Sequence, residues 1–173
     1  MSTGTGVTAD QVKELRARTG AGVMDCRRAL AEAGGDLDRA ADLLRARGLA
    51  AAAQKAGRST TEGLVEAYIH GQGRLGALVE VDCETDFVAH TEDFRRLARE
   101  LAMQVAATDP RYLSREDVPL EARDNPQVQE QILLEQPYIR DAARRVQDLI
   151  TETVAKVGEN IQVRRFARFK VGE

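Results

Sequence analysis

The sequence predicts an α+β protein in which an N-terminal bundle of three helices precedes a three-stranded antiparallel sheet packed with helices. Up to about residue 48, apolar residues recur every three or four positions, which is the period of a helix. From residue 63 they alternate, which is the period of a strand, and this alternation returns near the C-terminus. Helical stripes fill the stretch between these strands. Strands and helices grouped in this way are typical of an α+β fold.

Residues 8–48 are predicted to form three short helices. The first begins after Thr8, because Gln11 three residues later can complete a capping box, in which each side chain satisfies a backbone N–H of the other residue. It ends before the glycines of the TGAG stretch, and the second helix ends at the next pair of glycines. Asp36 caps the third helix, which we predict to end at Gly48. Three helices of this size bury little surface, so the bundle must be compact.

The composition changes after the third helix. Residues 49–62 are rich in alanine and have no strong apolar stripe, which is typical of a partly helical linker. We therefore predict three segments, which are a helical bundle in residues 1–48, an Ala-rich linker in residues 49–62 and an α+β core in residues 63–173.

Three stretches alternate as strands do. The odd positions of residues 63–70 are apolar, and the Gly-Gln-Gly segment that follows can form the turn of a hairpin. The second strand returns with apolar odd positions as far as Cys83. The third begins at Ile161, but Arg165 breaks its alternation. The apolar odd positions of the three strands are Val65, Ala67, Ile69, Leu75, Ala77, Val79, Val81, Cys83, Ile161, Val163, Ala167, Phe169 and Val171.

Three further apolar residues have the opposite parity. Tyr68, Leu78 and Phe166 lie at even positions, so we predict apolar groups on both faces of the sheet. One face would take the helices, and the other, with these three residues, would need a second partner.

Two strong helices are predicted between the second and third strands. The first starts near Thr91 and the second runs from about Tyr138 to Val157, each with an apolar stripe. Residues 108–137 between them contain all four prolines, so this stretch is predicted to be a loop with one short helix around residues 127–135. The stripes consist of Phe94, Leu97, Ala98, Leu101, Ala102 and Val105 in the first helix and of Ile139, Ala142, Val146, Leu149, Ile150 and Val154 in the second.

The composition is that of a folded protein. Of the 173 residues 43% are hydrophobic and 31% are charged, which excludes a disordered chain. No stretch approaches the roughly 20 apolar residues that span a bilayer. The N-terminus lacks the basic and apolar regions of a secretory signal, so we expect a cytoplasmic protein. In a reducing compartment its two cysteines, Cys26 and Cys83, are expected to be free thiols.

The net charge of −3 disfavours nucleic acid as the main partner, because phosphate binding needs an excess of basic residues. The stretch RRFARFK near the C-terminus is a local exception. We predict that its basic residues form a solvated strand face or contacts with a partner protein rather than an RNA site. These residues are Arg164, Arg165, Arg168 and Lys170.

Three parts of the chain resemble the elongation factor Ts family, in the order in which the family has them. The first is VKELRARTGAGVMDCRRALAEAGGDLDRAADLLR, similar to the family's N-terminal bundle, and the second is EVDCETDFVAHTEDF, similar to its most characteristic motif. The third comprises EQPYIRD and KVGENIQVRRFARFKVGE, similar to its C-terminal signature. The resemblance covers nearly the whole chain. It implies a ubiquitin-associated-like (UBA-like) helical bundle joined to a core of three antiparallel strands with helices.

The resemblance also implies a function. Members of the family bind the GTPase elongation factor Tu in its GDP form, expel the nucleotide and let GTP replace it. The chain is therefore expected to be a guanine nucleotide exchange factor and not an enzyme, with no cofactor or metal of its own. A tip of four residues would enter the partner near its Mg²⁺ and dislocate that ion, while the bundle binds elsewhere. The residues so implied are Thr85, Asp86, Phe87 and Val88 at the tip and Arg16, Val23 and Met24 in the bundle.

The chain departs from the family in length. Longer members carry a second, related half of the core and often a coiled-coil insertion, and both are missing here. The segment between Val118 and Leu133 is shortened even against short members. The simplest replacement for the missing half is a homodimer, in which each copy takes the place of one half of the core. Residues 63–173 would then also be the dimerisation domain.

Several of these residues have a simpler structural explanation. Phe87 could be an ordinary core residue, although its acidic neighbours and the full TDFV match favour the tip. Asp86 could cap the helix that follows. Cys83 and His90 lack a second pair that would complete a zinc site. The acidic row leading to the tip is more simply a solvated strand face than an acid–base cluster. This row consists of Glu80, Asp82, Glu84 and Asp86.

No GxxxxGK[ST] phosphate-binding loop and no nucleophile with a matched base occurs in the sequence, so we expect no direct binding of nucleotide, nucleic acid or membrane. Two other classes of function remain open. The bundle alone is compatible with a ubiquitin-like or nascent-chain interaction module, which a pull-down with the GTPase would distinguish. The basic stretch is compatible with a ribosome-associated RNA-binding protein, which a salt-dependent titration with RNA would expose.

Overall fold

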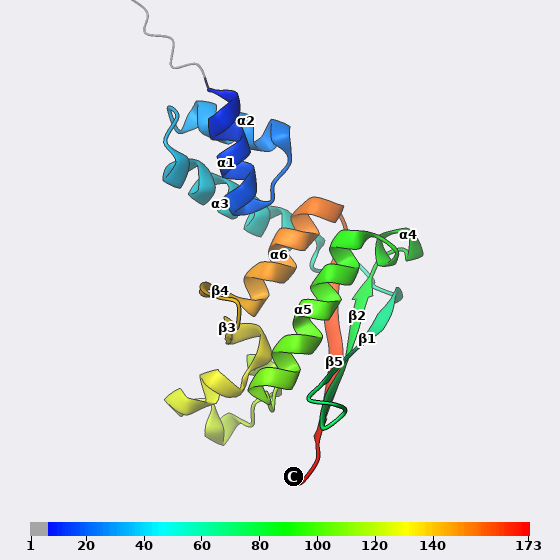
Figure 1. The fold of residues 1–173 in the computed structure, drawn as a ribbon. Helices are drawn as coiled ribbons and strands as arrows, with labels where there is room; N and C mark the ends of the chain where they lie inside the picture. The colour runs from blue at the N-terminus through cyan, green and yellow to red at the C-terminus, as the bar shows by residue number, and fades with distance from the viewer. Residues whose placement is uncertain (1–6) are drawn as a thin grey trace, which may run out of the picture.

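A computed structural model describes residues 7–173 of the chain. Residues 1–6, on which the expected absence of a secretory signal partly depends, lie outside the described residues. The helical bundle lies at one end of an elongated molecule, and a long helix leads from it to the sheet and its covering helices (Figure 1). Of the helices described, none has both the length and the apolar character needed to cross a membrane. The α+β class predicted from the sequence is confirmed.

Three helices form the N-terminal bundle, α1 (Ala9–Thr19), α2 (Val23–Glu32) and α3 (Leu37–Lys55). The predicted capping box is confirmed, because the Gln11 N–H donates to Thr8 Oγ1 over 3.2 Å and the Thr8 N–H donates to Gln11 Oε1 over 2.9 Å. The buried side chains of the bundle form a core of their own. They are Leu15, Cys26, Ala29, Leu30, Ala33 and Ala40.

The prediction that the third helix ends at Gly48 is wrong, because the helix continues to Lys55. The alanines after Gly48 are strong helix formers, and they outweigh the cost of about 1 kcal/mol for one glycine inside a helix. At this point α3 packs on α6 (Val146–Val157), where Gly48 lies beside Thr151 and Ala155. The predicted linker is therefore helical over about half of its length, and the domain boundaries themselves stay predictions.

The sheet has three antiparallel strands in the order β1–β2–β5, with β2 in the centre. A tight turn joins β1 to β2, so that Glu62 lies opposite Cys83 at the far end of the hairpin. The long connection from β2 to β5 contains the helices that cover one face of the sheet (Figure 1). The strands are β1 (Glu62–His70), β2 (Leu75–Cys83) and β5 (Ile161–Lys170).

The helices cover the face of the sheet that carries Tyr68, not the face with the odd-numbered residues of β1. Tyr68 lies opposite the buried Ala77, and directly opposed residues of an antiparallel pair share a face. Val65 and Ile69 are consequently 63% and 65% exposed. The prediction that Tyr68 lies on the open face is therefore wrong. Leu78 does lie there, 45% exposed.

A β-bulge in β5 reverses the predicted side of Phe166. The pairing with β2 shifts by one residue next to Arg165, which leaves Arg164 as an extra residue without a position opposite it. The extra residue moves every later side chain of β5 to the other face. Phe166 therefore packs against the covering helices, so its prediction on the open face is wrong. The bulge also explains why Arg165 breaks the alternation.

The first predicted covering helix is confirmed as α5 (Glu92–Thr108). Thr91 caps it, since its hydroxyl oxygen accepts the Phe94 N–H over 3.3 Å. Its predicted apolar stripe is buried throughout. The core between α5, α6 and the sheet is built mainly from Val79, Val81, Cys83, Phe94, Leu97, Leu101, Val105, Val146, Ile150, Val154, Ile161 and Val163.

The second predicted covering helix starts later than expected. Instead of a helix from about Tyr138, the chain forms a small hairpin of β3 (Pro137–Tyr138) and β4 (Asp141–Arg145). The helix α6 begins only at Val146. Asp148 fixes this start, because its carboxylate accepts the backbone N–H of the N-cap residue over 2.8 Å.

Gln104 of α5 holds the hairpin in place. Its side-chain amide donates to the Pro137 carbonyl over 3.2 Å and accepts the Ile139 N–H over 2.9 Å. Gln104 is itself 1% exposed, and a buried amide needs such partners. A helix that began at Tyr138 would need the Pro137 carbonyl for its first internal hydrogen bond, whereas the Ile139 N–H in its first turn would have no partner within the helix.

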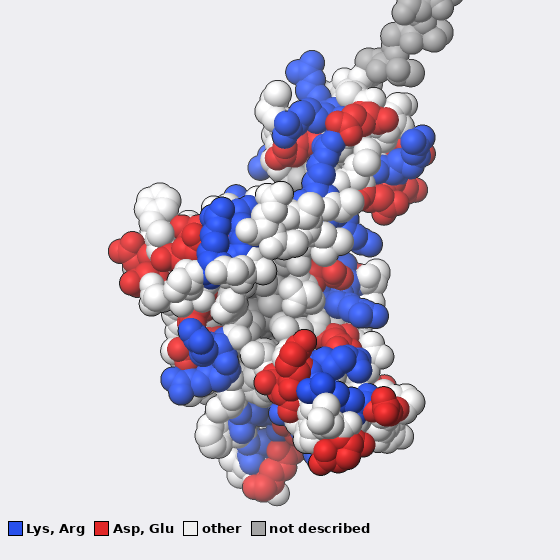
Figure 2. Space-filling view, turned by 180° about the vertical axis from the view of Figure 1, so that it is seen from behind, with Lys and Arg blue, Asp and Glu red and all other residues white. Residues whose placement is uncertain are grey.

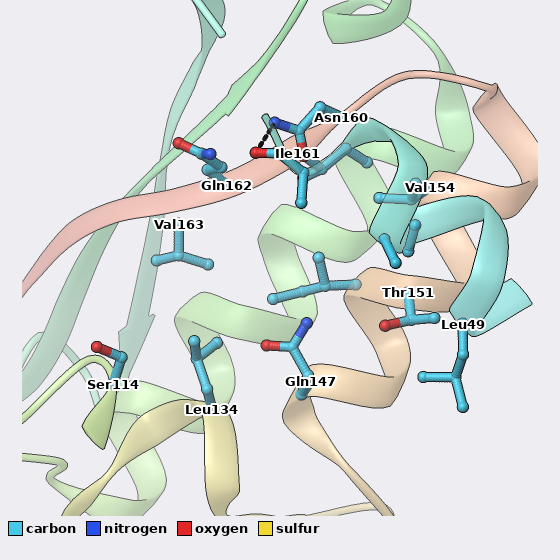
Figure 3. Close-up of a pocket in the computed structure, with 14 residues that line it drawn as sticks. Leu49, Ser114, Leu134, Gln147, Thr151, Val154, Asn160, Ile161, Gln162 and Val163 are labelled. Atoms are coloured by element: carbon cyan, nitrogen blue, oxygen red, sulfur yellow. Dashed lines mark hydrogen bonds between the residues drawn. The ribbon is translucent and has the colours of Figure 1, made fainter. Parts of the chain in front are cut away.

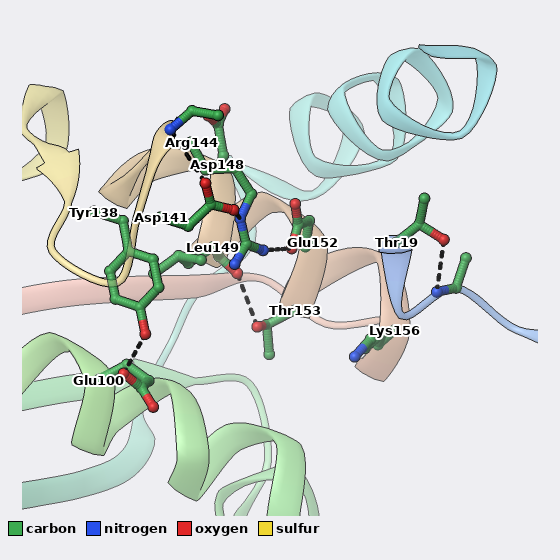
Figure 4. Close-up of polar contacts among 12 residues, drawn as sticks. Thr19, Glu100, Tyr138, Asp141, Arg144, Asp148, Leu149, Glu152, Thr153 and Lys156 are labelled. Carbon is green, nitrogen blue, oxygen red and sulfur yellow. Dashed lines mark hydrogen bonds and ion pairs between the residues drawn. The ribbon is translucent and has the colours of Figure 1, made fainter. Parts of the chain in front are cut away.

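Tyr138 and Arg144 add polar contacts around the hairpin (Figure 4). The Tyr138 hydroxyl donates a hydrogen bond to Glu100 on α5. Burial raises the pKa of Tyr138 to about 12, and the hydrogen bond to Glu100 also raises it. The Arg144 guanidinium bridges Asp141 and Glu152, at 2.9 Å from each. It also lies over the Tyr138 ring. These contacts tie the hairpin to both long helices.

We expect Tyr138→Phe to lower the free energy of unfolding by about 1 kcal/mol at neutral pH, the typical net contribution of one hydrogen bond. The pKa of Tyr138 is raised from 10.0 to about 12 in the folded chain. The hydroxyl therefore stabilises the fold fully below the unfolded pKa and loses this contribution as the pH rises through the folded one. The difference in unfolding free energy between wild type and variant should shrink over that window, as measured by urea unfolding followed by circular dichroism.

The matched control is Tyr112→Phe, since the hydroxyl of Tyr112 makes no hydrogen bond within the described residues. At neutral pH it should lower the free energy of unfolding by less than Tyr138→Phe does, because it removes a hydroxyl without removing a hydrogen bond. A difference for Tyr138→Phe that stays constant with pH would contradict the prediction.

Between α5 and the hairpin the chain forms short 3₁₀ turns rather than regular helices. The helix predicted around residues 127–135 consists of two such turns, η3 and η4. A small apolar cluster of Val118, Val128 and Ile132 lies beneath them. The turns are η1 (Arg115–Asp117), η2 (Leu120–Ala122), η3 (Pro126–Gln131) and η4 (Leu133–Glu135).

Candidate functional site

The loop after β2 carries a one-turn helix, α4 (Asp86–Ala89), at the corner of the molecule beside the start of α5 (Figure 1). Thr85 caps it, since its hydroxyl oxygen accepts the Val88 N–H over 3.4 Å. At its other end the Thr91 hydroxyl donates to the Val88 carbonyl over 2.7 Å. Two threonines thus fix the ends of the tip, which we define as residues 85–88.

Only one side of the tip is packed. Val88 is 4% exposed and Ala89 6%, and both belong to the main core. Phe87 is 80% exposed, the highest value among the large apolar side chains of the described part. The explanation of Phe87 as an ordinary core residue is therefore excluded. A fixed turn presents its ring to solvent, where a partner can bury it.

Asp86 lies beside Phe87 and is exposed. The caps of α4 and α5 are Thr85 and Thr91, so the explanation of Asp86 as a helix cap is wrong. Figure 2 shows acidic side chains gathered at the corner that carries α4. The tip thus combines an aromatic ring with a negative surface.

A turn from near the other end of the chain holds the base of the tip. The Glu159 carboxylate, just before β5, accepts the N–H groups of Glu84 and Thr85 over 3.1 and 3.0 Å. It also accepts the Thr85 hydroxyl over 2.7 Å. Glu159 is not among the predicted site residues, and it lies 74 residues from Thr85. The available signal was the GEN triplet within the C-terminal signature, but a motif does not tell which distant segment it contacts.

Cys83 lies directly behind the tip and is fully buried. Burial raises the pKa of its thiol to about 11, so the thiol is protonated at neutral pH, and Sγ donates to the Thr85 carbonyl over 3.1 Å. His90 is exposed, and its Nδ1 lies 2.6 Å from the Asp86 carbonyl oxygen. Across residues 7–173, no group of three or more His, Cys, Asp and Glu side chains is placed to hold a metal ion.

Two residues of the acidic row on β2 pair with two residues of the basic stretch on β5. Arg164 Nε donates to Asp82 over 2.9 Å. Arg165 pairs with Glu80 on the neighbouring strand. Farther along β5, the two remaining basic side chains of the stretch both pair with Glu173. Each basic side chain of the stretch thus has a carboxylate partner. The surface is not solvated throughout, since Asp82 is 8% exposed and the Arg168 side chain 11%.

The predicted contacts of the bundle lie at the surface around one loop. Arg16 is in the last turn of α1, and Val23 and Met24 begin α2 just after the TGAG loop. Val23 is 51% exposed and Met24 64%. Cys26, one turn further on, is buried in the bundle core, and burial raises its pKa. The bundle therefore presents apolar surface on an element separate from the tip.

A cavity of about 580 Å³ lies between the end of α3, α6 and the start of β5 (Figure 3). No ionisable side chain lines it. Because nucleophilic and acid–base chemistry need such groups, the cavity is not a candidate catalytic site. Its apolar lining includes Leu49, Ala52, Leu134, Ile150, Val154 and Ile161.

The chain is similar to proteins of one family. The family model described as Elongation factor TS matches residues 51–128. The chain is 52% identical to Elongation factor Ts of Caldanaerobacter subterraneus subsp. tengcongensis, over 96% of this chain and 98% of that protein. It is 52% identical to Elongation factor Ts of Moorella thermoacetica, over 96% of each chain. Elongation factor Ts of Carboxydothermus hydrogenoformans is 51% identical, over 96% of this chain and 90% of that protein.

These alignments extend over 195 positions, more than the 173 residues of the chain, so the relatives contain residues that this chain lacks. The shortening is predicted to lie between Val118 and Leu133. In that stretch the chain has the short turns η2 and η3 and no α-helix. The location of the shortening stays a prediction.

Proposed function

Since the chain belongs to the elongation factor Ts family, we propose that it is a guanine nucleotide exchange factor for the GTPase elongation factor Tu. It binds the GDP form of that partner, loosens the hold on Mg²⁺ and GDP, and lets GTP enter. It makes and breaks no covalent bond, needs no cofactor or metal of its own, and binds no nucleotide, nucleic acid or membrane directly. The observation that supports this proposal most directly is the exposed ring of Phe87 on a fixed tip.

The residue types of the tip suit this task. GDP in such a GTPase is held by a loop whose N–H groups and lysine contact the phosphates, with Mg²⁺ bridging to them. Phe87 displaces side chains beside that loop without offering a competing ligand. The carboxylate of Asp86 unsettles the Mg²⁺ shell or the hydrogen bonds that support it. The tip therefore weakens nucleotide binding by deforming its site.

The tip alone does not supply enough free energy. A thousandfold acceleration of GDP release requires a barrier lower by about 4 kcal/mol. Burying one Phe side chain supplies about 1.5–3 kcal/mol. In this proposal the N-terminal bundle supplies the remainder by binding the GTPase through Arg16, Val23 and Met24.

Thermodynamic linkage closes the cycle. If the chain weakens GDP binding by some factor, GDP weakens binding of the chain by the same factor. Incoming GTP with Mg²⁺ therefore displaces the exchange factor, and the cycle needs no energy input from this chain.

Release of fluorescent GDP from elongation factor Tu, measured by stopped flow, tests the function. We expect the release rate to rise with the concentration of the chain toward a plateau far above the spontaneous rate. A rate that stays at the spontaneous value at every concentration would contradict the proposal. An interaction module would bind without this acceleration.

The contribution of the bundle can be separated from that of the tip. We expect the double variant Val23→Ser/Met24→Ser to raise the concentration of chain needed for half-maximal GDP release about tenfold, because two apolar contacts are lost. The plateau rate should change little, since the tip is intact. Ile139→Ser, at an exposed apolar position outside the bundle, is the control. An unchanged half-maximal concentration in the double variant would contradict a docking role for the bundle.

We also propose that the chain forms a homodimer through the open face of its sheet. Near the tip this face carries the cross-strand ion pairs, and toward the β1–β2 turn it is apolar. Gly76 lies in the middle of the apolar half, between Ile69 and Phe169 on the neighbouring strands. A twofold axis makes such a patch self-complementary. The exposed apolar residues of this half are Val65, Ala67, Ile69, Leu78, Ala167 and Phe169.

A further inference from the structure

Two segments far apart in the sequence form reciprocal hydrogen bonds at the base of the tip, each through a carboxylate that accepts backbone N–H groups of the other. The Glu159 side chain accepts the N–H groups of Glu84 and Thr85 and the Thr85 hydroxyl, at 3.1, 3.0 and 2.7 Å. In return the Glu84 carboxylate accepts the Asn160 N–H over 2.7 Å. We call these four residues, Glu84, Thr85, Glu159 and Asn160, the clasp. Each half of the clasp satisfies backbone groups of the other.

The clasp extends to the segment that links α3 to β1. The Asn160 side-chain amide donates to the carbonyl oxygens of Ala56 and Arg58, over 3.3 and 2.8 Å. Asn160 is 4% exposed and lies at one end of the cavity between α3 and β5 (Figure 3). Arg58 also pairs with Glu84 at 3.4 Å. One turn thus connects the chain leaving the bundle with the base of the tip.

A single-turn helix does not fix its own direction, because helix nucleation is costly and four residues provide few internal hydrogen bonds. α4 therefore depends for its orientation on contacts with the rest of the chain, which are the burial of Val88 and Ala89 in the core and the hydrogen bonds of Thr85. The Thr85 hydroxyl accepts the Val88 N–H and donates to Glu159, so one side chain connects the helix to the clasp. Phe87 follows Thr85 by two positions. The contacts of Thr85 to Glu159 are therefore among those that set the direction of the ring.

We propose that Glu159 is a positioning residue for nucleotide exchange, which holds the tip in the direction that enters the partner's nucleotide site. This inference rests on the proposed function. Glu159 acts through Thr85 and does not itself contact the nucleotide site. Its side chain is long enough to bring acceptor oxygens to two N–H groups and one hydroxyl. This length (reach), and not the negative charge, is the property that matters in this proposal.

Three substitutions separate reach from charge. Glu159→Ala removes all three hydrogen bonds. Glu159→Asp keeps the charge but is one methylene shorter, so it does not reach both N–H groups. Glu159→Gln keeps the length without the charge; its oxygen accepts the N–H groups, and its amide donates to the Thr85 hydroxyl oxygen. Glu62→Ala is the control, because Glu62 lies opposite Cys83 at the same corner, is exposed, and its side chain makes no hydrogen bond within the described residues.

Stopped-flow release of fluorescent GDP at increasing concentrations of each variant is the test. We expect Glu159→Ala and Glu159→Asp to lower the plateau rate about tenfold, because small displacements of a positioned group have large kinetic effects. The half-maximal concentration should stay within about twofold, since the bundle still docks. Glu159→Gln should restore most of the plateau rate, and Glu62→Ala should match wild type. Amide hydrogen exchange at Glu84 and Thr85 should be faster in the two slow variants and near wild type in Glu159→Gln.

The outcomes distinguish this inference from the function on which it rests. A wild-type chain that does not accelerate GDP release would contradict the proposed function. Acceleration by wild type with an unchanged plateau in both Glu159→Ala and Glu159→Asp would overturn only the positioning role. So would Glu159→Asp as fast as wild type with Glu159→Gln slow, since charge and not reach would then matter. If Glu159→Ala does not fold, the Asp and Gln variants decide the question.

Discussion

Phe87→Ala is expected to lower the plateau rate of stimulated GDP release at least about tenfold. Truncating an aromatic side chain that is buried at an interface costs about 2 kcal/mol or more, and about 1.4 kcal/mol corresponds to tenfold in rate. The ring is 80% exposed in the free chain, so its removal leaves no cavity. The free energy of unfolding should therefore change by less than about 0.5 kcal/mol. Stopped-flow release rates and urea unfolding measure the two effects separately.

The control for this prediction is Leu120→Ala. Leu120 is 75% exposed on η2, so its truncation also removes an apolar side chain from the surface. It should leave both stability and exchange unchanged. Plateau rates for Phe87→Ala within about twofold of wild type would rule out a wedge role for the ring.

Phe169→Glu is expected to split the homodimer into single chains. Phe169 is 71% exposed in the single chain and lies in the apolar half of the open face. A twofold axis through this half would bring two new carboxylates close together without partners, and burying such charges is costly. Size exclusion with light scattering should give twice the 19.0 kDa chain mass for wild type and the single-chain mass for the variant.

Two comparisons make this result specific. Leu120→Glu places the same charge at another exposed apolar position and should leave the dimer intact. Phe166→Glu would instead disturb the packing of the sheet on its helices, because Phe166 lies on the covered face. A wild-type mass equal to that of one chain at micromolar concentration would contradict the homodimer.

Elements with local signals could be predicted from the sequence. The caps Thr8 and Thr91 form hydrogen bonds with residues three positions away, so the sequence contains both partners of each bond. The apolar stripe of α5 is long enough for the helical period to be unambiguous. The α+β class followed from the same short-range patterns.

Features that depend on distant contacts could not be predicted. The late start of α6 reflects Gln104, whose amide binds the hairpin over 30 positions away in sequence. The run of α3 through Gly48 reflects its packing on α6 as well as the alanines that follow. Neither contact produces a periodic pattern of apolar residues in the local sequence from which it could be predicted.

The candidate site was predicted in part for the same reason. The tip is contiguous, so a resemblance to a family motif could identify Thr85 to Val88 as one unit. Its exposed ring and buried base are findings of the structure. Glu159 escaped prediction because its hydrogen bonds to the tip join segments more than 70 positions apart. A motif marks such a residue without indicating what it touches.

The bulge at Arg164 makes the assignment of the two faces of β5 depend on a single position. If Arg164 paired in register with Glu80, without a bulge, the remaining side chains of β5 would lie on the opposite faces. Phe166 would then leave the core, and Phe169 would turn toward the helices. The bulging out of one residue therefore decides which of two aromatic rings stabilises the single chain and which remains available to a second copy.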